Sequence, residues 1–367
     1  MIAASQDVSV VVENQYRTES QQPYYAYNGI AASDPLNPDW GQAGTTLYAP
    51  VIMKDYWGWY SELVLLNAGS ATATGNIEYY GPNGTPVYTK PFSLPPNGSL
   101  NTNYSGGAAN TLYSARIVSD QPLAAVVLQY NYNVTVMQTY NCLSAGASTV
   151  YAPLIVNNYY GWDTSVNIQN TGDSLATVFV QYYNASGTEV GDPKVDDIPP
   201  YASRSRYSPS EGLPPNFIGT ARIYSYQQPV AVVVNQSYSY GGSPVRGQSY
   251  SGTSSGSTYV VLPDVLNFYG SENEKWVTSV NVQNLGTSTT VATLTYQGQS
   301  VESPPPGIKP KGIYSFYVPY YWGATPSRGP ATVSADQPVA VVVNQSDVTY
   351  PTRDLARSYN GYNRVSP

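Results

Sequence analysis

The stretch QPVAVVVNQ at residues 228–236 recurs letter for letter at 337–345, and a close variant, QPLAAVVLQ, occupies 121–129. The prolines of these stretches are separated by 107 and 109 residues. A period near 100 residues is the size of a domain, whereas solenoid repeats run about 20 to 50 residues. The repetition therefore predicts tandem domains.

The pattern inside each copy is that of β-strands. In SVNIQN, residues 165–170, Val166 and Ile168 alternate with polar side chains, as in a strand with one buried face and one wet face. Glycine-containing turns such as YYNASGTEV, residues 182–190, separate the strand-like runs. No segment has the 3.6-residue period of an amphipathic helix. About seven short strands in about 100 residues is typical of an immunoglobulin-like (Ig-like) sandwich, so we expect an all-β protein.

Composition restricts the chemistry that is available. The chain has no histidine and one cysteine, Cys142. A Ser-His-Asp triad and a thiolate or imidazole zinc site are therefore excluded, and we expect no enzyme activity, cofactor or metal. Charged residues make up 11% of the chain and acids outnumber bases 23 to 16, which argues against a nucleic-acid partner. Without a run of 18 apolar residues, we expect no membrane insertion.

The repeated pattern supports a resemblance. Its elements YAP, GW, SVNIQNTG, VQYYNASGT, IPP, ARI and QPVAVVVNQ resemble the tandem Ig-like or fibronectin-like β-sandwich repeats of prokaryotic cell-surface proteins. The resemblance covers residues 46–367 and implies an extracellular or cell-surface location. Since no export signal is recognisable, the chain is either cytosolic or part of a longer exported protein. The disulfide of antibody-type domains is absent, so the resemblance carries over the sandwich architecture alone.

The N-terminus resembles the end of a copy. Residues 2–15, IAASQDVSVVVENQ, align with 333–345 with Glu13 as an extra residue, which predicts a β-bulge. The YYAYNGI stretch from Tyr24 matches RSYNGY from Arg357. We therefore predict three tandem Ig-like domains plus a partial-domain hairpin, with these boundaries: an orphan closing hairpin at 1–32, a linker at 33–45, and domains at 46–147, 148–257 and 258–367.

Three explanations of residues 1–32 remain open. The hairpin belongs to a longer array and folds back on the first repeat, it completes or augments a sandwich of a neighbouring molecule, or it is disordered. Val8, Val10 and Val12 would lack a complete partner sheet. Val64 and Leu66 stand where the other repeats carry Asn and Gln, so something apolar should cover that face unless the two side chains are simply exposed. These five residues are the candidate self-assembly surface.

The tryptophans divide into two groups. Three recur at one place in each copy, where a packing role is expected: Trp59, Trp162 and Trp276. Three occur once each, in or near loops, and are candidates for stacking on sugar rings or for packing between domains: Trp40, Trp57 and Trp322.

Two acidic loops and the cysteine complete the candidate residues. SDPLNPDWG (33–41) and GDPKVDD (191–197) could offer oxygen ligands to calcium, but they lack EF-hand spacing and are expected to be solvated turns. Cys142 is expected to be a small buried residue, although an exposed thiol could crosslink chains.

The sequence leads to two functional hypotheses. The first is a non-enzymatic extracellular structural protein, a rod of three sandwiches used in a surface filament, stalk or surface layer, with itself as partner and strand exchange through residues 1–32 as the means of assembly. The second is a carbohydrate-binding or adhesion module that uses Tyr-rich and Trp-rich faces to bind surface glycans.

Overall fold

The computed structural model describes most of the 367-residue chain. The described residues are 2, 8–15, 23–39, 41–104, 106–241, 243–350 and 353–365. With 64% of the residues in strands and 2% in helix, the predicted all-β class is confirmed.

The strands fall into an N-terminal hairpin and three successive sets. The hairpin consists of β1 (Val11–Gln15) and β2 (Tyr24–Asn28). The first set contains β3 (Gly44–Lys54), β4 (Trp59–Asn67), β5 (Ala73–Tyr80), β6 (Pro86–Leu94), β7 (Ser99–Asn103), β8 (Thr111–Asn131) and β9 (Val136–Asn141). The second contains β10 (Thr149–Asn157), β11 (Trp162–Asn170), β12 (Ala176–Asn184), β13 (Glu189–Ile198), β14 (Ser203–Tyr207), the 3₁₀ turn η1 (Ser208–Ser210), β15 (Phe217–Ser225), β16 (Val230–Tyr240) and β17 (Ser243–Ser251). The third contains β18 (Ser257–Asn267), β19 (Trp276–Asn284), β20 (Ala292–Tyr296), β21 (Gln299–Glu302), β22 (Ile313–Tyr317), α1 (Val318–Trp322), β23 (Ser327–Asp347), β24 (Ala356–Asn360) and β25 (Tyr362–Arg364). We call these sets the first, second and third units.

The second unit is sandwich-like. One sheet has the strand order β10-β15-β12-β13 and the other has β14-β11-β16-β17. Apolar side chains from both sheets meet in one core, which includes Val166 and Ile168 of the SVNIQN stretch. The predicted alternation is thus realised, because the valine and isoleucine point between the sheets.

The first and third units repeat this order, but their two layers are joined by a long strand. A single 21-residue strand, β8 or β23, takes the place of the consecutive strands β15 and β16. Its first half pairs with β3 and β5, or with β18 and β20, and its second half pairs with β4 and β9, or with β19 and β24. The long strand therefore belongs to both layers of its unit.

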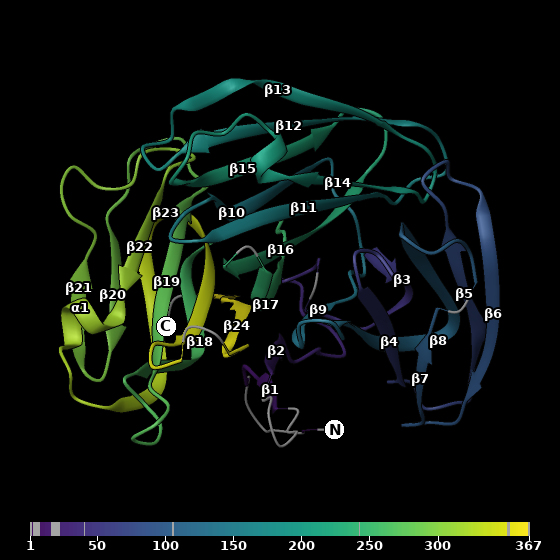
Figure 1. Ribbon diagram of the computed structural model, residues 1–367, viewed down its shortest axis with the longest axis horizontal. Helices are drawn as coiled ribbons and strands as arrows, with labels where there is room; N and C mark the ends of the chain where they lie inside the picture. The colour runs from purple at the N-terminus through teal and green to yellow at the C-terminus, as the bar shows by residue number, and fades with distance from the viewer. Residues whose placement is uncertain are drawn as a thin grey trace.

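The units form an arch instead of the rod that the tandem repeats suggested (Figure 1). The reason lies in the outward residues of the QPVAVVVNQ strands. Ala231 and Val233 of β16 are part of the core cluster of the first unit, and Val342 of β23 is part of that of the second. Consecutive units share apolar cores, which fixes the angle between them.

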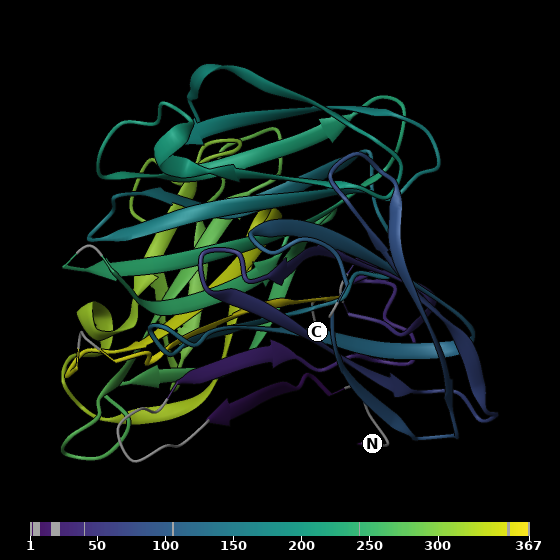
Figure 2. The ribbon, with the colours of Figure 1, turned by 45° about the vertical axis from the view of Figure 1, so that its right-hand side comes forward.

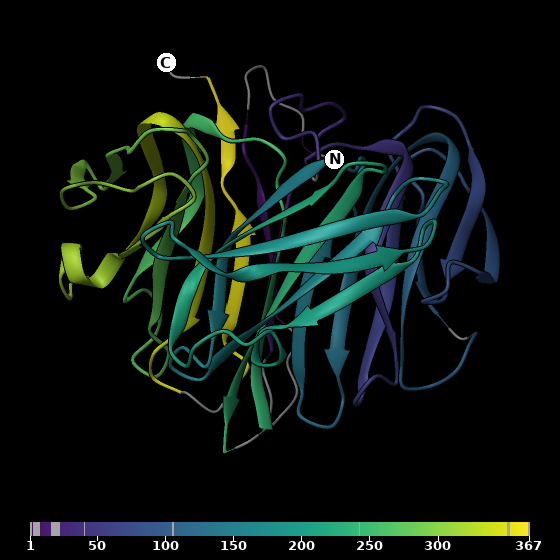
Figure 3. The ribbon, with the colours of Figure 1, turned by 90° about the horizontal axis from the view of Figure 1, so that it is seen from above.

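The closing strands β9, β17, β24 and β2 meet in the middle of the arch (Figure 3). The side chain of Asn28 donates to the carbonyl of Asn360 (2.7 Å) and accepts from its N–H (3.0 Å). Asn360 makes the same pair of bonds with the backbone of Ser251, at 2.7 and 3.0 Å. Asn141 in turn donates to the carbonyl of Asn28 at 3.0 Å.

These four polar residues hold one equivalent position. Each lies opposite a valine of its partner strand: Val11, Val126, Val233 and Val342. The contacts run in one direction around the centre, from the first unit to the hairpin, from the hairpin to the third unit, and from the third to the second. The hairpin thus takes the fourth place of a pseudo-symmetric ring, between the third unit and the first.

The register of the hairpin corrects one expectation. Pairing from Val11 to Gln15 with Asn28 to Tyr24 is continuous, so Glu13 is not a bulge. Glu13 faces Ala26, at the position that Asn344 holds opposite Ser358 in the third unit.

The segment between β2 and β3, predicted as a linker with a solvated acidic turn, is instead docked. The carboxylate of Asp39 accepts hydrogen bonds from the backbone N–H (2.6 Å) and the hydroxyl (2.8 Å) of Ser254, and its carbonyl accepts from the N–H of Ser144. Asp34 pairs with Arg364 at 3.4 Å. Both carboxylates are buried, so the solvated-turn expectation is wrong here. Burial raises the pKa of Asp39, although the bonds from Ser254 lower it.

Candidate functional site

The N-terminal hairpin is anchored in the same chain by its inner face. Val11 packs against the core of the third unit, at the position that Val342 and Val233 hold against the second and first cores. Val10 and Val12 alternate with Val11 and therefore face the other way. They are half-buried, whereas Val8 is 53% exposed.

Val64 and Leu66 lie on the face of the first unit that adjoins the fourth place of the ring. Both are half-buried. Their equivalents in the second unit, Asn167 and Gln169, are buried against the preceding unit, and Gln169 donates to the carbonyl of Ala115 at 3.1 Å. The face is thus less covered in the first unit than in the second.

A charged cluster holds the hairpin to the third unit. Glu13 pairs with Arg357 (2.9 Å) and Arg328 (3.2 Å), and Asp264 pairs with the same two arginines at 3.5 and 2.6 Å. Burial raises the pKa of Glu13, with Arg357 acting in the opposite direction. The same burial lowers the pKa of Arg357. No sequence motif indicated this cluster, because its four members are far apart in the chain.

A tyrosine in each closing strand bonds to the opening strand of its own unit. Tyr140 donates to the carbonyl of Val51 (2.7 Å) and Tyr250 to that of Leu154 (2.6 Å). In the third unit, Tyr359 donates to the carbonyl of Asp264. The equivalent residue of the hairpin is Tyr27, which pairs with Val12 as Tyr359 pairs with Val343.

Four of the tryptophans pack in or against the apolar cores. Trp276 is buried, and Trp59 and Trp162 pack half-buried against the first and second cores, so the expected packing role is confirmed. Trp322 packs against the third core, and its indole N–H donates to the carbonyl of Tyr296 at 3.1 Å.

The other two single-copy tryptophans differ. Trp57 is 75% exposed at a turn, and Trp40 lies outside the described residues.

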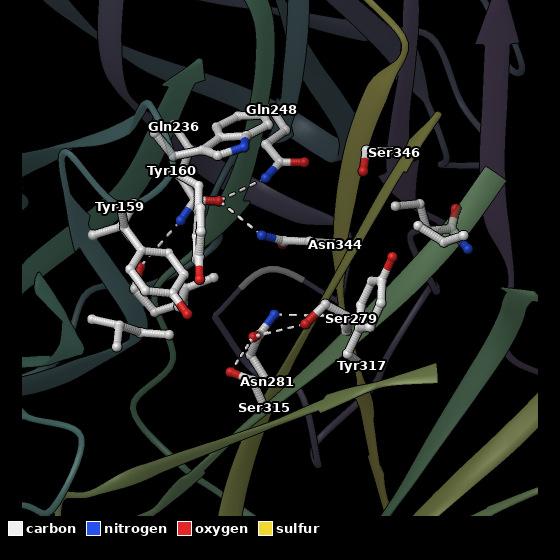
Figure 4. Close-up of a pocket in the computed structure, with 16 residues that line it drawn as sticks. Tyr159, Tyr160, Gln236, Gln248, Ser279, Asn281, Ser315, Tyr317, Asn344 and Ser346 are labelled. Carbon is white, nitrogen blue, oxygen red and sulfur yellow. Dashed lines mark hydrogen bonds between the residues drawn. The ribbon is translucent and has the colours of Figure 1, made fainter. Parts of the chain in front are cut away.

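A cleft of about 570 Å³ lies between the second and third units (Figure 4). Strands β10, β15, β16 and β17 form one wall, and β19, β22 and β23 form the other. None of the residues that line it is charged. Its polar groups are amides and hydroxyls: Tyr159, Tyr160, Gln236, Gln248, Ser279, Asn281, Ser315, Tyr317, Asn344, Gln345 and Ser346.

The aromatic side of the cleft comes from the turn between β10 and β11. Tyr159 and Trp162 exchange backbone hydrogen bonds at 3.1 and 3.0 Å across this turn. Tyr160 between them has φ of 48° and is 80% exposed. A large side chain with positive φ is strained, and such strain clusters at functional sites. Trp57 has the equivalent place in the first unit, with φ of 53°. From the sequence alone Trp57 belongs to the single-copy tryptophans, because the second copy has Tyr160 at the equivalent position.

The amides of the cleft leave two buried acceptors open. The side-chain oxygen of Gln236 accepts from Gln248 (2.9 Å) and Asn344 (3.1 Å). The side-chain oxygens of Gln248 and Asn344 are buried without a hydrogen-bond partner among the described residues. Buried acceptors favour a donor such as a hydroxyl group or a water molecule.

The cleft recurs between the first and second units in a smaller form of about 370 Å³. Tyr56, Asn167, Ser205 and Tyr207 correspond there to the cleft residues Tyr159, Asn281, Ser315 and Tyr317. Arg204 adds a charge to this smaller cleft. The arrangement can bind a neutral polar ligand by hydrogen bonds and ring stacking.

The acidic stretches and the cysteine are the remaining candidate residues of the sequence. No group of three or more His, Cys, Asp and Glu side chains suited to a metal ion is found among the described residues. The second acidic stretch, 191–197, lies within strand β13 and is not the expected turn, and its Asp196 pairs with Arg206 at 2.7 Å. Cys142 is buried as expected, and burial raises the pKa of its thiol. Within the same described part, no helix is long and apolar enough to cross a membrane.

Comparisons with known proteins give weak likenesses only. No family model and no curated protein matches the chain. The crystal structure of Thermotoga maritima 1070 is 20% identical with a TM-score of 0.25, and the match covers 29% of this chain and 93% of that one. A tetra-tandem repeat in the extending region of a large adhesion protein is 14% identical with a TM-score of 0.13, and the match covers 98% and 82%. Likenesses at this level identify neither a family nor a function.

Proposed function

We propose that this chain is a non-enzymatic structural protein of the cell surface, in which three Ig-like domains and a partial fourth form the subunit of a filament, stalk or surface layer. The observation that carries the proposal is the repeated interface. The same outward strand residues and the same closing-strand position join one unit to the next. A contact that propagates through one chain is suited to propagating between chains.

Light scattering and negative-stain microscopy test this function over a range of concentrations. We expect the full chain to form oligomers or filaments, and a variant lacking residues 1–32 to form none. Because that deletion also removes contacts to the third unit, the double variant V10K/V12K serves as a second test, since both side chains face away from that unit. A full chain that stays monomeric at high concentration would overturn the proposal.

A second candidate function is the binding of a neutral saccharide in the cleft between the second and third units. The strained, exposed ring of Tyr160 and the open acceptors of Gln248 and Asn344 favour it. Sugars present hydroxyl donors and apolar ring faces, which such a wall can bind without charge.

A glycan array with the full chain and its Y160A variant tests this second candidate. We expect binding of a neutral oligosaccharide to weaken at least tenfold in Y160A. The control is Y226A, because Tyr226 is equally exposed (80%) but packs beside Phe179 and Tyr224, outside the cleft. An array without response, or equal losses of binding in both variants, would rule out saccharide binding in the cleft.

A further inference from the structure

The fourth place of the ring is unfinished on the side of strand β1. In the second unit β16 lies between β11 and β17, and in the third unit the second half of β23 lies between β19 and β24. Strand β1 is their equivalent, but within the described residues it pairs only with β2. Figure 2 shows β1 at the open end of the arch, with no strand beyond it. One edge of β1 is therefore open to β-augmentation.

The outer face of β1 is also less covered than the same face of its equivalent strands. Val232, Val234, Val341 and Val343 are at most 4% exposed, because each faces the core of its own unit. The corresponding Val10 and Val12 are only half-buried. An apolar face beside an open strand edge is the pattern of a sandwich that lacks its front strands.

Tyr27 points to the missing element. Its equivalents Tyr140, Tyr250 and Tyr359 each donate to a carbonyl of an opening strand. Among the described residues, no opening strand stands beside Tyr27 to offer the equivalent carbonyl. An incoming opening strand would supply this acceptor, and the strand that follows it would pair with β1.

We propose that the fourth place binds the opening and second strands of a sandwich unit of this repeat type, presented by another chain. The second strand pairs antiparallel with β1 in the register of β11 with β16, which places the equivalent of Val166 opposite Val12. The incoming unit would also adjoin Val64 and Leu66. This inference names the partner in the assembly proposed above and rests on that proposed function.

A labelled peptide tests the pairing directly. Residues 149–170, TVYAPLIVNNYYGWDTSVNIQN, contain the opening and second strands of the second unit. We expect saturable binding to the full chain by fluorescence anisotropy, with new amide-exchange protection confined to 8–15 and 24–28. A peptide of scrambled order is the control for non-specific adhesion.

Two variants separate this mode from other contacts. Y27F removes one hydroxyl. We expect it to lower the affinity for the peptide about tenfold, as the loss of one buried hydrogen bond implies. V12K should lower the affinity for the peptide further. An unchanged melting temperature shows that each variant is folded. No binding of the ordered peptide, or binding that both variants leave unchanged, would overturn the inference.

The outcome is distinguishable from that of the proposed function. If the full chain forms filaments that the peptide neither joins nor blocks, the strand-pairing inference fails and the structural function stands. If the chain is monomeric but binds the peptide in register, the inference stands and the filament function fails.

Discussion

Single polar side chains stabilise this fold by bonding to the backbone. The fully buried amide of Asn170 donates to the carbonyls of Ser174 and Ile198, and its oxygen accepts from the N–H of Gly172. Asn284 makes the corresponding bonds in the third unit. These contacts join the backbone groups of a turn to those of a neighbouring strand end. A chain with few charges can therefore build its turns from Asn, Gln and Tyr.

Replacing Tyr250 by Phe tests this role at one residue. The hydroxyl of Tyr250 donates to the carbonyl of Leu154 at 2.6 Å and accepts from its N–H at 3.1 Å. We expect Y250F to lower the free energy of unfolding by about 1–2 kcal/mol, because both buried groups lose a partner. Y27F is the matched control, since Tyr27 has no opening strand to bond within the described part of the chain. Urea unfolding gives the comparison, and equal losses in the two variants would contradict it.

Elements were predictable from the sequence where a local pattern determines them. The alternation in SVNIQN follows from its period of two, and the two strands expected near the N-terminus follow from the likeness to the end of a repeat; the structure has β11, β1 and β2 at these places. Partners across large sequence distances were not predictable. Glu13 and Arg357 are 344 residues apart, and the sequence does not reveal that they meet.

The charged cluster makes the hairpin the element to test. In E13A, Asp264 is the remaining counter-ion of the buried Arg357 among the described residues, so we expect local opening of β1 and β2 to become easier by about 1–3 kcal/mol. Hydrogen exchange of the hairpin amides measures this. E78A is the control, because it removes a comparable ion pair inside the first unit, whose Arg116 is 28% exposed where Arg357 is 5% exposed, and it should leave the hairpin amides unchanged. Unchanged hairpin protection in E13A would show that the ion pairs of Glu13 do not hold the hairpin, which leaves Val11 and the hydrogen bonds of the Asn28 side chain as its anchors.

The whole molecule departs furthest from the prediction. Tandem repeats suggested a rod because each copy alone predicts a complete sandwich. The arch arises from outward residues such as Val233 and Val342, which pack into the cores of the first and second units. Likewise, the cleft of the second and third units combines Tyr160 with Asn344, which no motif relates. Because the units share cores, we expect the chain to unfold in fewer transitions than three independent units would.

Asp354 joins three parts of the arch at its centre. Its carboxylate accepts from the N–H of Met137 (2.6 Å) in the first unit and of Gly247 (2.9 Å) in the second. Its carbonyl accepts from the N–H of Tyr24 at 3.1 Å. Burial raises the pKa of Asp354 well above its usual value, although these N–H groups and Arg246 lower it. D354A leaves two N–H groups without their partner, and we expect it to cost about 3 kcal/mol.

The pH dependence of that cost follows from the direction of the shift. A carboxyl whose pKa is raised by folding stabilises the fold fully below its unfolded pKa of about 3.9, and this contribution is lost as pH rises through the folded value. The penalty of D354A is therefore expected to be larger near pH 4.5 than at pH 8 in urea titrations. Asp120 provides the opposite case, since hydrogen bonds from Thr74 lower its pKa, so the penalty of D120A should be lost toward low pH. A D354A penalty that grows with pH would mean that the two N–H groups and Arg246 outweigh burial at the centre of the arch.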